Sequence, residues 1–242
     1  MVAELAALMA HHGPALVLSG AGMSTASGLP DYRGPSGLWR NRRFEELASI
    51  NMWRNHPDEF WEFYRMRLDQ LRSARPNPGH DVLARLEQAG HVSCIITQNV
   101  DGLHARAGST TLEVHGSLAH AICLTCGHRL PMDEALQRAG DELVPFCACG
   151  SVLKPDVVLF GEMLPPAFEE SIAMVQRCSS LLVLGTSLQV EPVASIVRLA
   201  ASCGARVAIV TMGTTSSDAL ADVRIDSDIA STLLDLASLL EV

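Results

Sequence analysis

The chain has 242 residues, and 48% of them are hydrophobic, which is enough for one domain with an insertion or for two domains. Its net charge of −9 at pH 7 argues against direct nucleic-acid binding, and no apolar run approaches the roughly 20 residues of a membrane span. The first residues show no basic leader or small-residue cleavage site, so we expect a cytoplasmic protein, and a monomer.

Helix-like and strand-like segments alternate along the chain. Helices are expected at 1–12, over most of 44–71, and at 80–89, 192–201 and 229–240. Strands are expected where apolar residues run together, at 15–19, 92–97, 111–114, 157–160, 180–184 and 206–210. This alternation predicts an α/β protein with a doubly wound parallel sheet of the Rossmann-like type.

A glycine-rich turn follows the strand expected at 15–19 directly. Gly20 permits a tight turn, Gly22 lets the backbone approach a pyrophosphate, and Ser24 or Thr25 can cap the helix that follows. The spacing departs from G-x-G-x-x-G because Thr25 occupies the third glycine position. The turn therefore predicts a dinucleotide-binding loop, with an ordinary βα turn as the alternative.

Polar side chains follow two other predicted strands. Gln98, Asn99 and Asp101 come after 92–97, and His115 comes after the next short apolar segment. Ligands of open α/β sheets bind at the carboxyl ends of the strands. Amide, carboxylate and imidazole groups there predict a site that orients a sugar and moves a proton. The alternative is that each is a cap or a satisfied buried polar group.

Four cysteines form two close pairs, Cys123-x-x-Cys126 and Cys147-x-Cys149. Such pairs are typical of a tetrahedral structural zinc site, and four thiolates leave no open position for a catalytic water. The second pair is tighter than the usual Cys-x-x-Cys spacing. The alternative is a set of reduced thiols without metal.

Six short motifs occur in the order found in sirtuins, and the resemblance runs from about residue 14 to the C-terminus. They are Gly20-Ala21-Gly22-Met23-Ser24, Pro30-Asp31-Tyr32-Arg33-Gly34, Thr97-Gln98-Asn99-Val100-Asp101, His115-Gly116, Phe160-Gly161-Glu162 and Gly185-Thr186-Ser187-Leu188. The sequence thus resembles the sirtuins, which are NAD-dependent protein-lysine deacylases.

The resemblance implies a reaction in which the acyl oxygen of a substrate lysine attacks the nicotinamide ribose of NAD and nicotinamide leaves. His115 then acts as general base on a ribose hydroxyl, Asn99 orients the ribose and a water, and Asp101 holds the nicotinamide carboxamide; these three are the expected catalytic residues. The products are free lysine, nicotinamide and O-acyl-ADP-ribose. The expected NAD-binding residues are Gly20, Ala21, Gly22, Ser24, Tyr32, Arg33, Gln98, Asn99, Val100, Asp101, Gly185, Thr186, Ser187 and Thr211.

The protein substrate is expected to enter as an added strand between two segments of the chain. Gly161 and Glu162 pair with it on one side and Leu188 to Val190 on the other, while Val158 and Phe160 line a tunnel for the lysine stem. For these apolar residues, plain core packing is the alternative.

Tyr64 and Arg67 lie three residues apart on a predicted helix and so share a face. They resemble the Tyr-x-x-Arg pair of sirtuins that remove succinyl and malonyl groups, in which a planar guanidinium suits a carboxylate. The alternative is a solvated arginine beside a packed tyrosine. Pro35 stands where this class tends to have alanine, and Thr211 stands where the family commonly has asparagine.

The resemblance implies a two-lobed enzyme with one structural zinc. The NAD-binding domain is expected to comprise 1–33, 80–116 and 154–242, and the smaller lobe a helical insertion at 34–79 with a zinc module at 117–153. A mono-ADP-ribosyltransferase using the same NAD site is the nearest alternative. A non-catalytic NAD-sensing or zinc-ribbon module is another, but binding alone needs no general base such as His115.

Overall fold

The strands predicted near the start of the chain lie at the centre of a parallel sheet. The computed structural model describes residues 1–32, 34, 37 and 42–242. Within them the main sheet has six strands, in the order β3 (Thr111–Glu113), β2 (Val92–Thr97), β1 (Ala15–Ser19), β7 (Ser180–Leu184), β8 (Arg206–Val210) and β9 (Val223–Ile225). The direction of winding reverses between β1 and β7, which makes their carboxyl ends the switch point where α/β proteins bind ligands.

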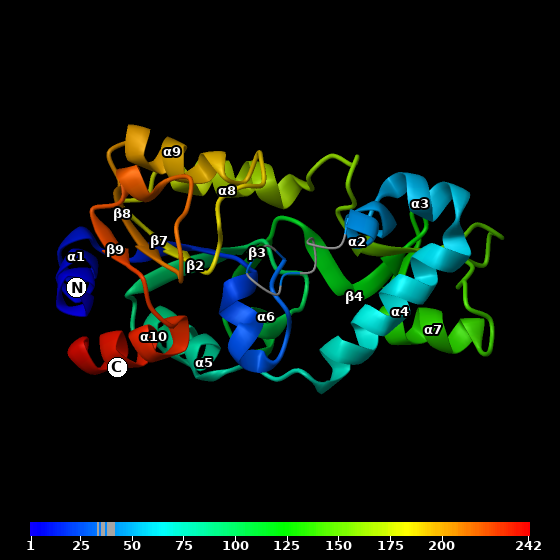
Figure 1. The fold of residues 1–242 in the computed structure, drawn as a ribbon, viewed down its shortest axis with the longest axis horizontal. Coiled ribbons are helices and arrows are strands. Elements are labelled where there is room, and N and C mark those ends of the chain that lie inside the picture. The colour runs from blue at the N-terminus through cyan, green and yellow to red at the C-terminus, as the bar shows by residue number, and fades with distance from the viewer. Residues whose placement is uncertain (33, 35–36, 38–41) are drawn as a thin grey trace.

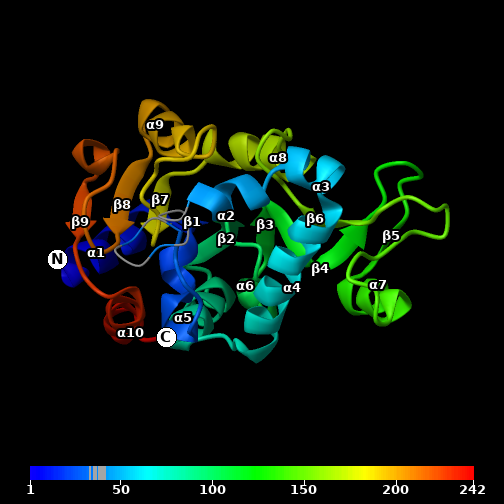
Figure 2. The same ribbon diagram turned by 45° about the vertical axis from the view of Figure 1, so that its right-hand side comes forward.

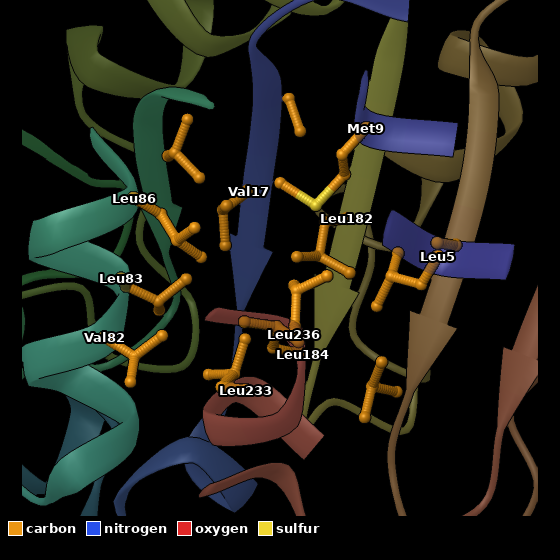
Figure 3. Close-up of a cluster of buried hydrophobic side chains, with 14 of the residues drawn as sticks. Leu5, Met9, Val17, Val82, Leu83, Leu86, Leu182, Leu184, Leu233 and Leu236 are labelled. Atoms are coloured by element: carbon orange, nitrogen blue, oxygen red, sulfur yellow. The ribbon is translucent and has the colours of Figure 1, made fainter. Parts of the chain in front are cut away.

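Helices cover both faces of this sheet (Figure 1). One face packs against α1 (Val2–His12), α5 (Pro78–Gln88) and α10 (Ile229–Leu239), and the other against α8 (Pro166–Val175) and α9 (Ser195–Ser202). Figure 3 shows Val17 and Leu182 of the sheet packed among leucines of the first group of helices. Every residue of β1 and β7 is buried, as expected for central strands covered on both faces.

The second lobe packs helices against a small antiparallel sheet (Figure 2). Its strands lie in the order β5 (Arg129–Pro131), β4 (Gly116–Ile122) and β6 (Lys154–Val157), and its helices are α2 (Arg42–Leu47), α3 (Ile50–Asn55), α4 (Pro57–Ser73) and α7 (Met132–Ala139). The indole nitrogens of Trp53 and Trp61 both donate to the Leu153 carbonyl, at 3.0 and 3.1 Å. The helical insertion and the zinc module therefore share one core, and the expected fold class is confirmed.

The strand expected at 157–160 was wrong in position and in partner. β6 begins three residues earlier and pairs with β4 of the small sheet. Residues 158–160 instead continue along the helical insertion, because the Phe160 amide donates to the Ala48 carbonyl at 3.0 Å and its carbonyl accepts from Ile50. The apolar run therefore does not mark a strand of the main sheet. The domain boundaries given above remain predictions.

In the described part of the chain, the helices are too short or too polar to cross a membrane.

Candidate active site and zinc centre

A cleft of about 1010 Å³ opens at the switch point, and both lobes line it. The expected site residues that line it are Gly20, Ala21, Gly22, Tyr32, Tyr64, Arg67, Gln98, Asn99, Val100, His115, Val158, Phe160, Gly161, Glu162, Gly185, Thr186, Ser187, Val190 and Thr211. Ser24 and Asp101 do not line the cleft. Arg33 and Pro35 lie outside the described residues.

The glycine-rich turn brings two loops of the protein together. The Gly22 amide donates to the Gly185 carbonyl at 2.9 Å, and a Cβ on Gly22 would lie 2.8 Å from the Gly185 Cα. Gly185 itself has φ +62°, which favours glycine. The expected approach of a pyrophosphate to Gly22 is therefore only part of the reason for a glycine here. The absence of a side chain also lets the loops after β1 and β7 contact each other.

The expected helix caps are wrong. Gly20 is the N-cap of a short 3₁₀ helix, Ala21–Ser27, and no side chain caps it. Ser24 instead donates to a carboxylate oxygen of Asp101 at 2.7 Å, and Thr25 donates to the Gly22 carbonyl at 2.9 Å. Both residues lie inside the helix and not at its N-cap position, which Gly20 occupies, so they do not cap its first amides.

Asn99 and Asp101 are joined through Ser24. The Asn99 amide donates to Ser24 Oγ at 3.2 Å and to the Gly20 carbonyl at 3.1 Å. Burial raises the pKa of Asp101 above its ordinary value, and hydrogen bonds from the Leu103 amide and Ser24 oppose this rise. Asn99 is thus fixed at the cleft wall, with Asp101 supporting it from behind.

His115 has its tautomer set by the backbone. Its Nδ1 lies 3.1 Å from the Gln98 carbonyl, and a carbonyl can only accept, so Nδ1 carries the proton and Nε2 keeps a lone pair. Burial lowers the pKa of His115 below its ordinary value, against a smaller opposing effect of the Gln98 hydrogen bond. At neutral pH the ring is therefore a neutral proton acceptor at the cleft.

Gln98 ties two walls of the cleft together. Its side-chain amide donates to Thr186 Oγ1 at 3.1 Å and to the Ser19 carbonyl at 3.4 Å. It therefore orients His115 through its backbone, while its side chain fixes the loop after β7.

Tyr64 and Arg67 are both buried on α4, so the alternative of a solvated Arg67 is excluded. Arg67 Nη2 donates to the Tyr32 hydroxyl at 3.2 Å, and buried Nη1 has no hydrogen-bond partner among the described residues. Burial raises the pKa of Tyr64 far above its ordinary range, so its hydroxyl stays protonated. Tyr64 also stacks on Phe60 with ring centroids 4.5 Å apart, as the packing alternative predicts.

Glu162 turns its side chain into the protein. Its carboxylate accepts from Lys154 Nζ at 2.9 Å and from the Leu159 amide at 2.8 Å. Lys154, the only lysine of the chain, also donates to the Val157 carbonyl at 2.5 Å. This mostly buried pair fixes the segment before Gly161.

The far end of the cleft includes residues that the sequence did not single out. Met212, Gly213 and residues 227–229 line it, after β8 and β9. Their position just past a strand end was the available signal for the first two. β9 has only three residues with a charged one in the middle, so no apolar run marks it.

The four cysteines converge as their spacing predicts. Their sulfur atoms all lie within 4.8 Å of one another, with Cys123 to Cys149 at 3.5 Å and Cys126 to Cys147 at 3.6 Å. Tetrahedral zinc with Zn–S bonds of about 2.3 Å places its sulfurs roughly 3.8 Å apart. The cluster therefore fits one structural zinc, and these two pairings cross between the Cys-x-x-Cys and Cys-x-Cys segments.

Two buried histidines pack behind the site. The rings of His80 and His104 have centroids 4.7 Å apart, and His104 Nε2 lies 2.9 Å from Ser19 Oγ. Burial lowers the pKa of His80 to about 4 and that of His104 to about 3. Each has a second ring nitrogen without a hydrogen-bond partner in the described structure, so a bound proton would be unsatisfied.

Folding stability is therefore expected to fall in mild acid. A histidine in the unfolded chain titrates near pH 6.5, so below this pH the unfolded state binds protons that the folded state does not bind. The free energy of unfolding is at its full value above pH 6.5. Between pH 6.5 and 5 it falls by about 2 kcal/mol per histidine. Urea unfolding at pH 7 and pH 5 measures this. The double variant His80→Gln/His104→Gln should show a smaller dependence of stability on pH. The control His12→Gln changes an exposed histidine and should keep the wild-type dependence. Equal stability of the wild type at both pH values would contradict the prediction.

The cleft, the glycine loops and the zinc lobe together define a two-lobed protein that binds a dinucleotide. A model of the Sir2 family matches residues 20–192. An NAD-dependent protein deacetylase of Halalkalibacterium halodurans is 40% identical over 225 residues, covering 91% of this chain and 92% of the relative. An NAD-dependent protein deacylase of Pyrobaculum aerophilum is 42% identical over 223 residues, with 91% and 88% covered.

The chain belongs to the Sir2 family, the sirtuins. A Sir2 structure with a deacetylated p53 peptide and 3′-O-acetyl ADP ribose has a TM-score of 0.93 and 33% identity, covering 98% of this chain and 97% of that one. A Sir2 complex with a p53 peptide and NAD⁺ has a TM-score of 0.91 and 33% identity, with 98% of both chains covered. The family is one of NAD-dependent protein deacetylases and deacylases, with NAD as cosubstrate.

Proposed function

We propose that this protein removes acyl groups from protein lysines and consumes NAD in doing so. The observation that carries the proposal is His115, whose Nδ1 is bound to the Gln98 carbonyl and whose lowered pKa leaves Nε2 free to take a proton. A ribose hydroxyl is a weak acid, so its attack on an acyl carbon needs such a base. The Sir2 relatives with acetyl-ADP-ribose and NAD⁺ support this choice of substrate.

In the proposed reaction the acyl oxygen of the substrate lysine bonds to the anomeric carbon of the nicotinamide ribose, and nicotinamide leaves. His115 takes the proton of a ribose hydroxyl, and that oxygen bonds to the acyl carbon. The lysine amine leaves, water adds to the acyl carbon, and the bond from that carbon to the oxygen on the anomeric carbon breaks, so O-acyl-ADP-ribose remains. Asn99 is held by Ser24 and the Gly20 carbonyl and orients the ribose. Asp101 accepts from Ser24 and so fixes Asn99 and the loop that contains Val100.

The substrate peptide is proposed to bind as a strand between Gly161 and Val190, which line opposite walls of the cleft. Val158 and Phe160 lie beside Gly161 and offer the apolar surface for the lysine stem. Phe160 is 38% exposed, unlike a core phenylalanine.

Product analysis tests the proposal. The full chain is incubated with NAD and an acetyl-lysine peptide, and mass spectrometry follows the peptide and the nucleotide. Free lysine peptide with O-acetyl-ADP-ribose is expected. ADP-ribose attached to protein, with the acetyl group retained, would instead indicate the mono-ADP-ribosyltransferase.

We also infer a preference for acidic acyl groups such as succinyl and malonyl. Arg67 is 9% exposed, and the described residues offer its guanidinium a tyrosine hydroxyl but no carboxylate. A buried unpaired charge is costly, so an acyl carboxylate that reaches Arg67 gains a charge-assisted hydrogen bond. Tyr64 adds a protonated hydroxyl on the same face of α4.

Replacing Arg67 with methionine tests this preference. The ratio of desuccinylation to deacetylation is expected to fall by roughly 10–100-fold, because a hydrogen bond to a charged group contributes about 1.5–3 kcal/mol. Steady-state kinetics on matched succinyl- and acetyl-lysine peptides measure the ratio.

Arg65→Met is the matched control, since Arg65 lies on the same helix but is bound to the Glu142 and Leu143 carbonyls. It should leave the ratio unchanged. Equal losses on both peptides in Arg67→Met would show that Arg67 only supports the fold. A wild-type enzyme that does not act on succinyl-lysine would contradict the inferred preference.

A further inference from the structure

The loop after β8 forms the far wall of the cleft. Thr211, Met212 and Gly213 line it beyond the glycine loops, at the end opposite His115. Met212 is 70% exposed and Gly213 has φ +77°, so packing of the loop's own side chains does little to fix its shape. Contacts from outside the loop must therefore hold it.

The Thr211 amide donates to the Ile225 carbonyl and the Gly213 amide to Asp226 Oδ1, and Arg224, in the middle of β9, supplies the remaining contacts. Its Nη1 donates to the Thr211 carbonyl at 3.0 Å and to the Ile225 carbonyl at 2.6 Å, and its Nη2 donates to the Gly213 carbonyl. Its Nε donates to Asp218 Oδ1 at 3.0 Å. One planar guanidinium thus joins both ends of the lining segment to the edge of the sheet.

The same network reaches the neighbouring wall of the cleft. Asp218 accepts from Thr215 Oγ1 at 2.6 Å and from the Thr215 amide at 3.1 Å. Ser216 then donates to the Leu188 carbonyl at 2.5 Å. The Arg224–Asp218 ion pair is partly buried, with the side chains 21% and 31% exposed, so solvent screens it less than a surface pair.

We propose that Arg224 is a positioning residue for the adenosine end of NAD. This rests on the proposed function, which puts the reacting ribose at His115. A dinucleotide that starts there and passes the Gly22–Gly185 contact has its adenosine over Thr211 and Gly213. Thr211 has a short side chain, so its hydroxyl reaches a ribose only if the backbone is held close, as Arg224 holds it.

Loss of this clamp weakens NAD binding without altering the chemistry. Arg224 contributes equally to the bound substrate and to the transition state, so its removal raises KM for NAD and leaves kcat and the peptide KM unchanged. We expect Arg224→Met to bind NAD and ADP-ribose about tenfold more weakly. Arg224→Lys, which keeps the charge but cannot reach all four acceptors, should show a smaller loss of the same kind.

Arg206→Met is the matched control. Arg206 lies on neighbouring β8 and pairs with Asp222 at 2.7 Å, but it is 55% exposed, and in the described structure its side chain makes no hydrogen bond or ion pair with the loop after β8. Titration calorimetry of the full chain with NAD and with ADP-ribose gives affinities that do not depend on turnover, and melting temperatures confirm folding. The control should match the wild type in both affinities.

Unchanged affinity in folded Arg224→Met, or a fall in kcat with KM unaltered, would overturn the proposal. If Arg224→Met does not fold, Arg224→Lys decides by the same criteria. A wild-type protein that binds NAD but releases no deacylated peptide would count against the proposed function alone, because the calorimetric comparison of variants would still hold.

Discussion

Replacing His115 with alanine is expected to lower deacylation by about 100-fold or more, because general-base catalysis contributes about that much or more. The Gln98 carbonyl fixes the proton on Nδ1, so the variant loses the Nε2 lone pair that serves as the base. Steady-state kinetics with an acetyl-lysine peptide measure the loss. The half-buried ring does not belong to the hydrophobic clusters of either lobe, so the melting temperature should change little.

The control is His91→Ala, another half-buried histidine, located at the opposite end of β2. It should retain wild-type turnover. Because burial places the pKa of His115 below the ordinary 6.5, wild-type activity should also persist as the pH falls to that value. A folded His115→Ala enzyme that still makes O-acetyl-ADP-ribose at near wild-type rate would remove His115 from the mechanism.

The sequence predicted the central strands well because their environment is uniform. Residues 15–19, 92–97, 180–184 and 206–210 are mostly apolar and buried, with Ser93 and Arg206 as exposed exceptions, and the structure gives them the same bounds. Continuous burial leaves a run that neither a loop nor an amphipathic helix produces. The segment 157–160 has the same apolar signature for another reason, since it packs in the small lobe and bonds to Ala48 and Ile50 instead of joining the main sheet, and periodicity cannot separate these cases.

The sequence predicted which residues belong to the candidate site better than it predicted how their side chains are arranged. Strand ends and motif order placed Asn99 and His115 at one cleft, as the structure has them. The turning of Ser24 toward Asp101 and of Glu162 toward Lys154 depends on partners 77 and 8 residues away in the chain, which local patterns do not encode. Arg224 was not predicted from the sequence, because it acts mainly on backbone carbonyls. Every residue carries such a carbonyl, so no sequence pattern marks these partners.

Loss of one zinc ligand is expected to unfold the small lobe and abolish activity. Structural zinc contributes about 10 kcal/mol or more in small zinc-binding peptides, where it replaces a core. Here Cys123 and Cys147 belong to the buried cluster that also contains Trp61, and the Leu153 carbonyl that follows the second pair binds both indoles. Cys126→Ser should therefore lose zinc, shift the emission of Trp53 and Trp61, and lower the melting temperature.

Activity is lost in this variant because the zinc lobe positions one side of the cleft. Tyr64 and Leu118 line the cleft and also belong to the buried cluster of the zinc lobe, so they move when that cluster opens. Elemental analysis should give one zinc per chain for the wild type and for Cys203→Ser, an exposed thiol outside the metal cluster. Chelator treatment of the wild type should reproduce the emission shift. Full activity in zinc-free protein would show that the four thiols hold the lobe together without metal.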